Sequence, residues 1–530
     1  MIMKQINIKL FMVAALFVVA TGCNDEFFDV IPTESMTDVT FWKSERDVEM
    51  ALTACYNNWE MEEYPYYMDC EAGNGYSQYG WEGFLEISSG TQGKNGTYWD
   101  YGRATLWNYE RITRYNTFLQ KIVDVDMDAD KKASYTTQVR FLRAYNYARK
   151  VNLFGDVPLV TQPFATPAEA AIGRTPAADV KKFIYDELQA IANSDALPEQ
   201  NDAQAGGRIT RGAAYALLAR QYLYDKDYTN ALANAKKVIA MPCFAIYTGG
   251  ATPEENYLGN FRKANQSSSQ EIILAHQRQT PSYTGAVWGY TLPSDYDGWS
   301  SVVVIKSLVD AYEMADGTLW NESYAEHPFD NRDPRLNMTV LNPGSTWDGV
   351  KWGWRDGNNN SRSGIYLKKY LKPYISMDEA WDSDADMPLF RLAEMYLTFA
   401  EAAFYLNQET GTALGYINEL RQRAGHVPAT ALTEDLIRRE RRIELCFEGL
   451  FWDDVRRWDW GSKVFKCNAQ GYNFEHDLDA NGDAVLKKEN GTAYVDIYNR
   501  DYDYVTTGYL LMIPQGEIDA NPQMKQNLGY

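Results

Sequence analysis

The chain has 530 residues, and 51 Lys and Arg residues against 72 Asp and Glu residues give it a formal net charge of −21. We expect no nucleic-acid partner, because nucleic-acid binding needs a basic surface. With 45% hydrophobic and 23% charged residues, the composition is that of a folded globular protein and excludes disorder as the main state. The 38 Tyr, 21 Phe and 15 Trp exceed what a core requires and suggest an aromatic contact surface.

The N-terminal segment predicts export. Two lysines precede an unbroken apolar run from residue 10 to residue 20, which has the length of a signal peptide and is too short to cross a bilayer. The run ends in Ala20-Thr21-Gly22-Cys23, which resembles a bacterial lipobox. The alternative is an ordinary secretory signal with a chance cysteine. We expect Cys23 to be acylated and to anchor the protein, because two or three acyl chains hold a protein stably on a membrane.

The remaining cysteines, at positions 55, 70, 243, 446 and 467, are odd in number and show no C-x-x-C spacing. This pattern argues against a full disulfide framework and against a zinc site. Cys55 and Cys70 could pair outside the cytoplasm, and the sequence leaves that question open. The four histidines are scattered, so we expect neither a metal nor a cofactor.

Apolar periodicity predicts helices in two blocks. Ser44, with Asp47 three residues on, is a plausible N-cap for the first helix. The predicted helices of the first block are 46–59, 106–123, 134–153, 176–191, 210–224 and 229–240. The pair 210–224 and 229–240 is close to a tetratricopeptide helix-turn-helix unit, because small residues let paired helices approach. The predicted helices of the second block are 388–407, 413–424 and 433–458, after which the chain is predicted to be loop-rich and, from residue 509, extended.

Between the two blocks the periodicity gives way to Gly, Asn, Ser, Asp and Trp. So long an irregular stretch in a folded chain is usually functional. We therefore expect a signal peptide at 1–22 and a single domain at 23–530. That domain would consist of an N-terminal helical part (23–240), an irregular binding region (241–387) and a C-terminal helical part with an extended tail (388–530).

Two acidic motifs have a catalytic or metal-binding interpretation. Glu440, Glu444 and Glu448 share one helix face and could suggest a glycosidase pair, but four neighbouring arginines favour structural ion pairs. The segment 477–483 resembles the first half of a calcium loop. Its twelfth position is Lys488, so a polar hairpin turn at Asn481-Gly482 explains it better. The common nucleophile, phosphate-loop and zinc motifs are absent from the sequence.

Aromatic residues cluster in three predicted loops. A glycan site needs a flat ring beneath the apolar face of a sugar and planar polar groups at its rim, and each cluster offers both. Roughly half of these rings would instead pack the loops onto the scaffold. The clusters are Tyr76, Tyr79, Trp81, Tyr98 and Trp99; Tyr283, Trp288, Tyr290, Tyr296 and Trp299; and Trp347, Trp352 and Trp354.

Four stretches together resemble the SusD/RagB family of outer-membrane nutrient-binding lipoproteins. The stretches are Phe27-Phe28-Asp29 through Ala54-Cys55-Tyr56; Arg140-Phe141-Leu142-Arg143-Ala144 through Val157-Pro158-Leu159; Pro388 through Arg456-Arg457-Trp458; and Ile513-Pro514 through Gly529-Tyr530. Phe451 and Leu528 depart from the family pattern, where an Arg and a Pro are usual. The resemblance implies a mainly α fold with about four tetratricopeptide-like helix pairs, no catalysis, and service as the lid of a TonB-dependent transporter.

The family's glycan platform is built from the loop after the first helix and from the segment leading to Gly298-Trp299-Ser300. The resemblance therefore points to the first two aromatic clusters. We expect six of their residues to bind ligand, namely Trp81, Trp99, Tyr283, Trp288, Tyr296 and Trp299.

The leading hypothesis is a non-enzymatic, lipid-anchored protein that faces the cell exterior and delivers glycan to its transporter. Capture of peptides or other nutrients in the same type of complex is one alternative, and an aromatic-poor cavity at the site would favour it. An outer-membrane glycoside hydrolase is the other, and two carboxylates converging near the aromatic rings would favour it.

Overall fold

The computed structural model describes residues 41–92, 101–200, 206–347, 349–354 and 360–530. The predicted signal peptide, Cys23 and Trp99 lie outside these ranges. The protein is mainly helical, with 46% helix and 10% strand, as predicted. Within the described ranges, we find no helix that is both long and apolar enough to cross a membrane.

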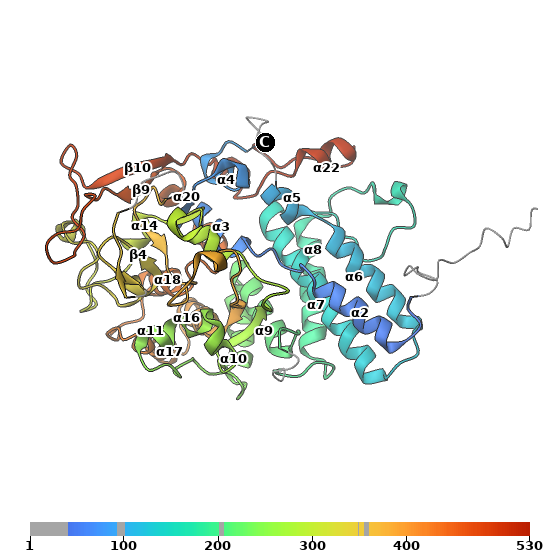
Figure 1. The fold of residues 1–530 in the computed structure, drawn as a ribbon. Helices are drawn as coiled ribbons and strands as arrows, with labels where there is room; N and C mark the ends of the chain where they lie inside the picture. The colour runs from blue at the N-terminus through green and yellow to red at the C-terminus, as the bar shows by residue number, and fades with distance from the viewer. Residues whose placement is uncertain (1–40, 93–100, 201–205, 348, 355–359) are drawn as a thin grey trace, which may run out of the picture.

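The N-terminal part is helical (Figure 1). Its first helix has a capping box, in which the Ser44 hydroxyl accepts from the Asp47 backbone N–H and the Asp47 carboxylate accepts from the Ser44 N–H. The sequence predicted this cap. The helices of this part are α2 (Glu45–Tyr56), α3 (Tyr64–Glu71), α4 (Leu85–Ser89), α5 (Tyr101–Trp107), α6 (Glu110–Lys121), α7 (Ala129–Phe154) and α8 (Ala177–Ala192).

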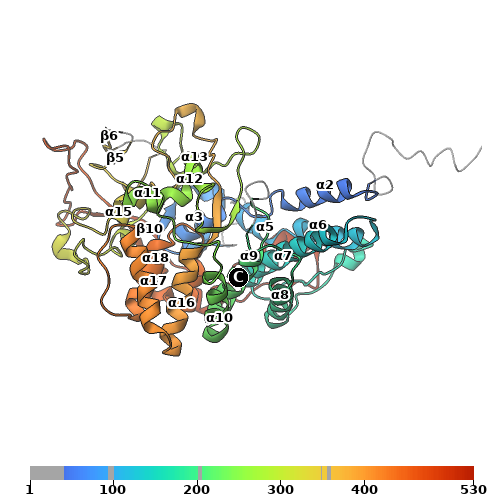
Figure 2. The same cartoon turned by 90° about the horizontal axis from the view of Figure 1, so that it is seen from below.

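The two helical blocks form one scaffold, because α10 of the first block packs on both α9 and α16. In Figure 2, α10 lies beside α16, and α17 lies on the other side of α16. Along the whole row, α6, α7, α8, α9, α10, α16 and α17 each pack on the next, which is a tetratricopeptide-like arrangement. The remaining bounds are α9 (Arg211–Tyr224), α10 (Tyr228–Ile239), α16 (Leu392–Leu406), α17 (Thr410–Arg423), α18 (Glu434–Glu444) and α19 (Phe451–Arg457).

The middle region is built around a small antiparallel sheet with the strand order β1-β3-β7-β4. Its strands are β1 (Gly75–Ser77), β3 (Val302–Val304), β4 (Val340–Leu341) and β7 (Tyr366–Leu367). The short helices of this region are α11 (Pro253–Leu258), α12 (Lys263–Gln266), α13 (Val287–Thr291), α14 (Lys306–Val309) and α15 (Arg335–Thr339). This sheet joins the N-terminal part, through β1, to the region that was predicted to be irregular.

Three two-stranded ladders complete the fold. They pair β2 (Ile272–His276) with β8 (Met387–Arg391), β5 (Thr346–Trp347) with β6 (Val350–Lys351), and β9 (Asn468–Tyr472) with β10 (Tyr494–Asn499). The C-terminal part also contains α20 (Gly461–Val464), α21 (Tyr504–Thr507) and α22 (Gln515–Ala520).

Three predicted elements were wrong in detail. The segment predicted as helix 388–407 begins as strand β8, because Leu389 and its neighbours are buried against β2. The segment predicted as helix 433–458 is interrupted between α18 and α19, where Phe447 and Gly449 have φ values of 61° and 76°. The tail after residue 509 contains the short helix α22.

Cys55 and Cys70 are buried and are not joined to each other. Burial raises the pKa of the Cys55 thiol to about 12, so it behaves as a small apolar group. The pairing that the sequence left open is absent from this structure.

Candidate functional site

Four aromatic rings from three separate segments meet at the surface of the middle region. We call Tyr79, Trp81, Trp299 and Trp381 the aromatic platform. Trp81 stacks on Tyr79 with ring centroids 6.1 Å apart, and it meets Trp299 edge to face at 5.6 Å. Trp299 in turn meets Trp381 at 4.5 Å. Trp81 and Trp299 remain 47% and 38% exposed, so their rings are available to a ligand.

The sheet brings the first two segments together. Strand β1 pairs antiparallel with β3 so that Ser77 lies opposite Val302. The pairing continues past the strands, because the Gln78 N–H donates to the Ser301 carbonyl at 2.9 Å. The Tyr79 hydroxyl then donates to the carbonyl oxygen of Trp299 at 2.9 Å. The residues that follow β1 are therefore fixed against the residues that precede β3.

Trp299 lies in a tightly constrained turn. Asp297 and Ser300 both adopt left-handed backbone conformations, with φ values of 59° and 48°. A Cβ at Gly298 would lie 2.1 Å from the Leu292 carbonyl oxygen, so only glycine fits there. The Trp299 N–H donates to the Gly289 carbonyl at 2.8 Å. Unfavourable conformations of this kind persist when surrounding contacts fix them, and they cluster at functional sites.

Trp381 completes the platform, and the sequence analysis missed it. Its indole N–H donates to the Asp297 carbonyl at 2.9 Å, which ties it to the Trp299 turn. The ring also lies over Gly289, where a Cβ would be 2.5 Å from it. The available signal was an isolated Trp in an Asp- and Ser-rich stretch, which resembles the composition of the predicted clusters.

Polar groups lie beside the platform. Asp297 and Arg362 are both exposed, and they offer the planar carboxylate and guanidinium groups that suit sugar hydroxyls. Burial and then Glu82 raise the pKa of Tyr79, whereas the Arg362 guanidinium lowers it, which indicates that Arg362 is close to this ring. The arrangement can stack a flat apolar face and hydrogen-bond a polar rim.

Glu82 follows Trp81 but is not available as an acid catalyst. It is only 5% exposed, and burial raises its pKa to about 7 against the opposing effect of the Ser301 and Tyr67 hydroxyls. A general acid must reach the glycosidic oxygen of the bound substrate. The Glu82 carboxyl group is instead buried against the Ser301 and Tyr67 hydroxyls.

Three of the other predicted residues take different positions. Trp288 is only 1% exposed and its indole N–H donates to the Tyr370 carbonyl at 2.9 Å, so its prediction as a ligand contact is corrected to a core position. Tyr296 is half-buried and stacks on the buried Trp352 at 5.8 Å. Tyr283 lines a separate cavity.

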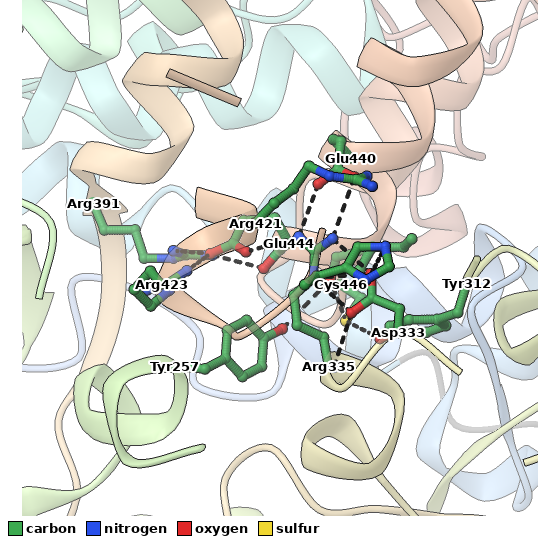
Figure 3. A network of polar contacts seen from close by, with 12 residues as sticks. Tyr257, Tyr312, Asp333, Arg335, Arg391, Arg421, Arg423, Glu440, Glu444 and Cys446 are labelled. Carbon is green, nitrogen blue, oxygen red and sulfur yellow. Dashed lines mark hydrogen bonds and ion pairs between the residues drawn. The ribbon is translucent and has the colours of Figure 1, made fainter. Parts of the chain in front are cut away.

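The three glutamates of the predicted helix face form buried ion pairs, and Figure 3 shows Glu440 and Glu444 among the arginines that surround them. Arg335 contacts Glu440 at 2.8 Å and Glu444 at 3.4 Å, and Arg391 contacts Glu444 and Glu448 at 2.8 Å each. Although burial opposes the effect, Arg423, Arg391 and Arg335 hold the pKa of Glu444 well below its usual value. The pairing of all three carboxylates with buried arginines confirms the structural interpretation of this motif.

The segment 477–483 folds as a turn. The Asp479 carboxylate accepts from the backbone N–H groups of Asn481 and Asp483 at 2.8 and 2.9 Å, and Gly482 has a φ of 81°. Flanking residues pair as a hairpin, since Phe474 bridges to Leu486. Among the described residues, no group of three or more His, Cys, Asp or Glu side chains could hold a metal ion.

Comparison with known families gives two matches that together cover most of the chain. The model of the SusD family matches residues 260–530. A second family model, described as "Starch-binding associating with outer membrane", matches residues 26–223.

Similarity to individual relatives supports the same family. The chain is 27% identical to the starch-binding protein SusD of Bacteroides thetaiotaomicron over 486 residues, covering 81% of this chain and 79% of that protein. It is 24% identical to a SusD-like protein of Bacteroides ovatus over 547 residues, covering 93% of this chain and 90% of that protein. A crystal structure of a SusD-like carbohydrate-binding protein from Bacteroides fragilis superposes with a TM-score of 0.81 at 25% identity, covering 92% of this chain and 100% of that one.

Proposed function

Because this chain belongs to the SusD family, we propose that it is a non-enzymatic, outer-membrane glycan-binding protein that captures oligo- or polysaccharide on the aromatic platform. The observation that carries the proposal is the convergence of the exposed Trp81 and Trp299 rings at 5.6 Å, beside polar side chains. Aromatic faces stack on the C–H face of a sugar, and neighbouring polar groups fix its orientation. Two relatives are known as a starch-binding protein and a carbohydrate-binding protein, which supports the same ligand class.

The proposal includes the location and the partner of the protein. Cys23 carries the lipid anchor, the folded domain faces the cell exterior, and the captured glycan passes to a TonB-dependent transporter that this protein covers as a lid. The lipobox-like sequence and the family description "associating with outer membrane" support the anchor and the location. The transporter enters through the resemblance to the family alone.

Two observations favour glycan binding over the alternatives. The site is rich in aromatic rings, whereas an aromatic-poor cavity would favour peptide capture. Glu82, the carboxyl group with a raised pKa nearest the platform in sequence, is buried, and Glu440, Glu444 and Glu448 are held in ion pairs elsewhere. Neither arrangement offers the acid and base pair that flanks a glycosidic bond in a hydrolase.

A glycan array probed with the soluble form that lacks residues 1–23 tests the proposal. We expect saturable binding to at least one neutral polysaccharide, loss of that binding in the Trp81→Ala/Trp299→Ala double variant, and no release of reducing ends. Binding of peptides without glycans, or the appearance of reducing ends, would replace this function with one of the alternatives.

A further inference from the structure

A second concave site lies away from the platform. It is a cavity of about 780 Å³ lined by α2 and the loop after it, by the segment 206–208, by Lys263, and by residues 275–279 with Tyr283. The lining residues from α2 and its loop are Met50, Thr53, Ala54, Tyr56, Asn57 and Trp59. We call it the α2 cavity. None of the four platform rings lines it.

The lining of the α2 cavity is basic, in contrast to the acidic chain as a whole. Arg208, Lys263 and Arg278 line it, and no Asp or Glu is among its described lining residues, although the whole chain carries a net charge of −21. Two acids hold these cations from outside the lining, since Lys263 pairs with Asp386 at 2.7 Å and Arg278 with Glu62 at 2.9 Å. The lining itself therefore presents basic groups to a ligand, two of them paired with acids behind it, and a basic lining favours ligands of the opposite charge.

Arg208 is held beside the cavity by its neighbours. Its guanidinium lies 4.5 Å from the centroid of the Tyr56 ring. The preceding residue, Gly207, has a φ of 78°, and a Cβ there would lie 2.6 Å from the Gln277 side chain. Only glycine allows this close approach, which sets Arg208 next to the 275–279 segment.

The uncharged lining suits a sugar ring. Tyr283 is partly exposed, and its hydroxyl lies 3.1 Å from Nε2 of His276. Burial and the nearby Arg278 lower the pKa of His276 to about 3, so the imidazole is neutral, and its buried Nδ1 has no hydrogen-bond partner among the described residues. The side-chain amides of Asn57, Gln277 and Gln279 add donors and acceptors to the lining.

The α2 cavity and the platform are joined by one short stretch of backbone pairing. Gly285 bridges to Ser383 with reciprocal hydrogen bonds of 2.8 and 2.7 Å, and the Thr284 hydroxyl donates to Asp382 at 2.9 Å. Tyr283 precedes this bridge on one segment and Trp381 precedes it on the other. In antiparallel pairing, these two positions lie towards opposite ends of the ladder. The same paired segments therefore support both sites.

We propose that the α2 cavity is a second saccharide site, which takes an acidic sugar with its carboxylate or sulfate group against the Arg208 guanidinium. The proposal rests on the proposed glycan-binding function and adds the ligand class of a site outside the platform. Guanidinium groups recognise carboxylate and sulfate oxygens through paired, charge-assisted hydrogen bonds, while the Tyr283 ring and the amides contact the sugar itself.

Calorimetric titration of the soluble form with three probes tests the proposal. The probes are trigalacturonate, the neutral galactose trimer, and a sulfated galactose trimer. We expect saturable binding of at least one acidic probe, at least tenfold weaker or undetectable binding of the neutral trimer, and at least tenfold weaker binding of that acidic probe to Arg208→Gln. The two acidic probes distinguish a carboxylate site from a sulfate site.

Three controls keep the outcomes separate. Lys466→Gln removes an exposed cation outside both sites and should leave acidic-probe binding unchanged. Trp81→Ala/Trp299→Ala should abolish platform binding and leave acidic-probe binding intact, so failure of the platform and failure of the α2 cavity are distinguishable. Unchanged melting temperature of Arg208→Gln shows that it is folded, and Tyr283→Ala provides a second variant of the cavity if it is not.

The proposal is overturned if neither acidic probe binds, or if the neutral trimer binds as tightly as the acidic ones. It is also overturned if the Trp81→Ala/Trp299→Ala variant, rather than the Arg208→Gln and Tyr283→Ala variants, loses the acidic probe. In that last case the acidic probe lies on the platform.

Discussion

Trp81 and Trp299 meet edge to face with their ring centroids 5.6 Å apart, although they lie 218 positions apart in the sequence. The contact follows from the antiparallel pairing of β1 with β3, which continues through the hydrogen bond from Gln78 to Ser301. The platform is therefore attached to paired strands at its base. Rings held in this way lose little side-chain freedom when a ligand binds, which favours affinity.

Truncation of Trp299 should affect binding much more than folding. Because Trp299 is a surface ring, Trp299→Ala should weaken glycan binding by about tenfold to a hundredfold, the effect of losing roughly 1–3 kcal/mol of stacking. The matched control, Trp288→Ala, removes a buried ring and should cost about 3–5 kcal/mol of folding stability. Titration and thermal melting of both variants check this. A sharp fall in the melting temperature of Trp299→Ala with normal binding by the folded fraction would remove Trp299 from the site.

The buried ion pairs of Glu444 should be essential to the scaffold. Glu444→Gln leaves Arg335, Arg391 and Arg423 with one fewer buried carboxylate, and we expect a loss of about 3–5 kcal/mol at neutral pH. Asp186→Asn breaks an exposed pair with Lys182 and should cost less than about 1 kcal/mol. Denaturant unfolding measures both. Equal effects of the two substitutions would contradict the structural role of this network.

The contribution of Glu444 to folding stability should decrease as the pH falls. Its pKa is lowered in the folded state, so its stabilising effect is present above the usual glutamate pKa and is lost as the pH falls below that value. The difference between the wild-type protein and Glu444→Gln should therefore narrow on acidification.

Glu82 should have the opposite pH dependence. Its pKa is raised to about 7 by burial, so the folded protein retains a proton that the unfolded chain releases between about pH 4.5 and pH 7. The protonated Glu82 contributes most to the free energy of unfolding below pH 4.5. Roughly 3 kcal/mol of this contribution is lost as the pH rises through 7. Glu82→Gln should remove this loss, so its melting temperature should improve relative to the wild type as the pH is raised.

An exposed substitution controls for general charge effects on this pH profile. Glu475→Gln changes a surface residue and should follow the wild-type curve across the same range. If the melting temperatures of Glu82→Gln and the wild type change with pH in the same way, Glu82 is ionised in the folded protein.

Chelation should not change the stability of the 477–483 turn. The Asp479 carboxylate is occupied by backbone N–H groups, so EDTA should leave the melting temperature unchanged. A ligand of the folded state stabilises it by mass action. A rise in melting temperature with added calcium that disappears in Asp479→Ala would identify a calcium site here.

The membrane anchor should depend on one atom, the Cys23 sulfur. Cys23→Ala should abolish membrane fractionation and leave the melting temperature of the domain unchanged, because acyl chains supply the anchoring energy. The experiment is done in cells that lack the transporter, so that docking cannot mimic the anchor. Persistent membrane association there would exclude Cys23 as the anchor.

The helices were predictable because their signals are local. The Ser44 cap and the apolar spacing after it predicted α2 to within a few residues, and α7 through α10 were found in the same way. A helix face is formed by residues three and four positions apart, and this spacing can be read directly from a single sequence. The strand β8 was missed because its pairing with β2 is not local, and the same buried apolar residues suit a helix equally well.

At the site, too, some features follow from the local sequence and others depend on tertiary contacts. The composition and order of the motifs led us to expect Trp81 and Trp299 at a binding surface, and the structure brings these two exposed rings together. Trp288 and Trp299 lie in the same cluster, yet one donates to Tyr370 inside the core and the other is exposed beside Trp381. Which face of a loop is covered depends on distant segments, so only the tertiary structure could assign Trp288 to the core, add Trp381 to the platform and place Tyr283 in a separate cavity.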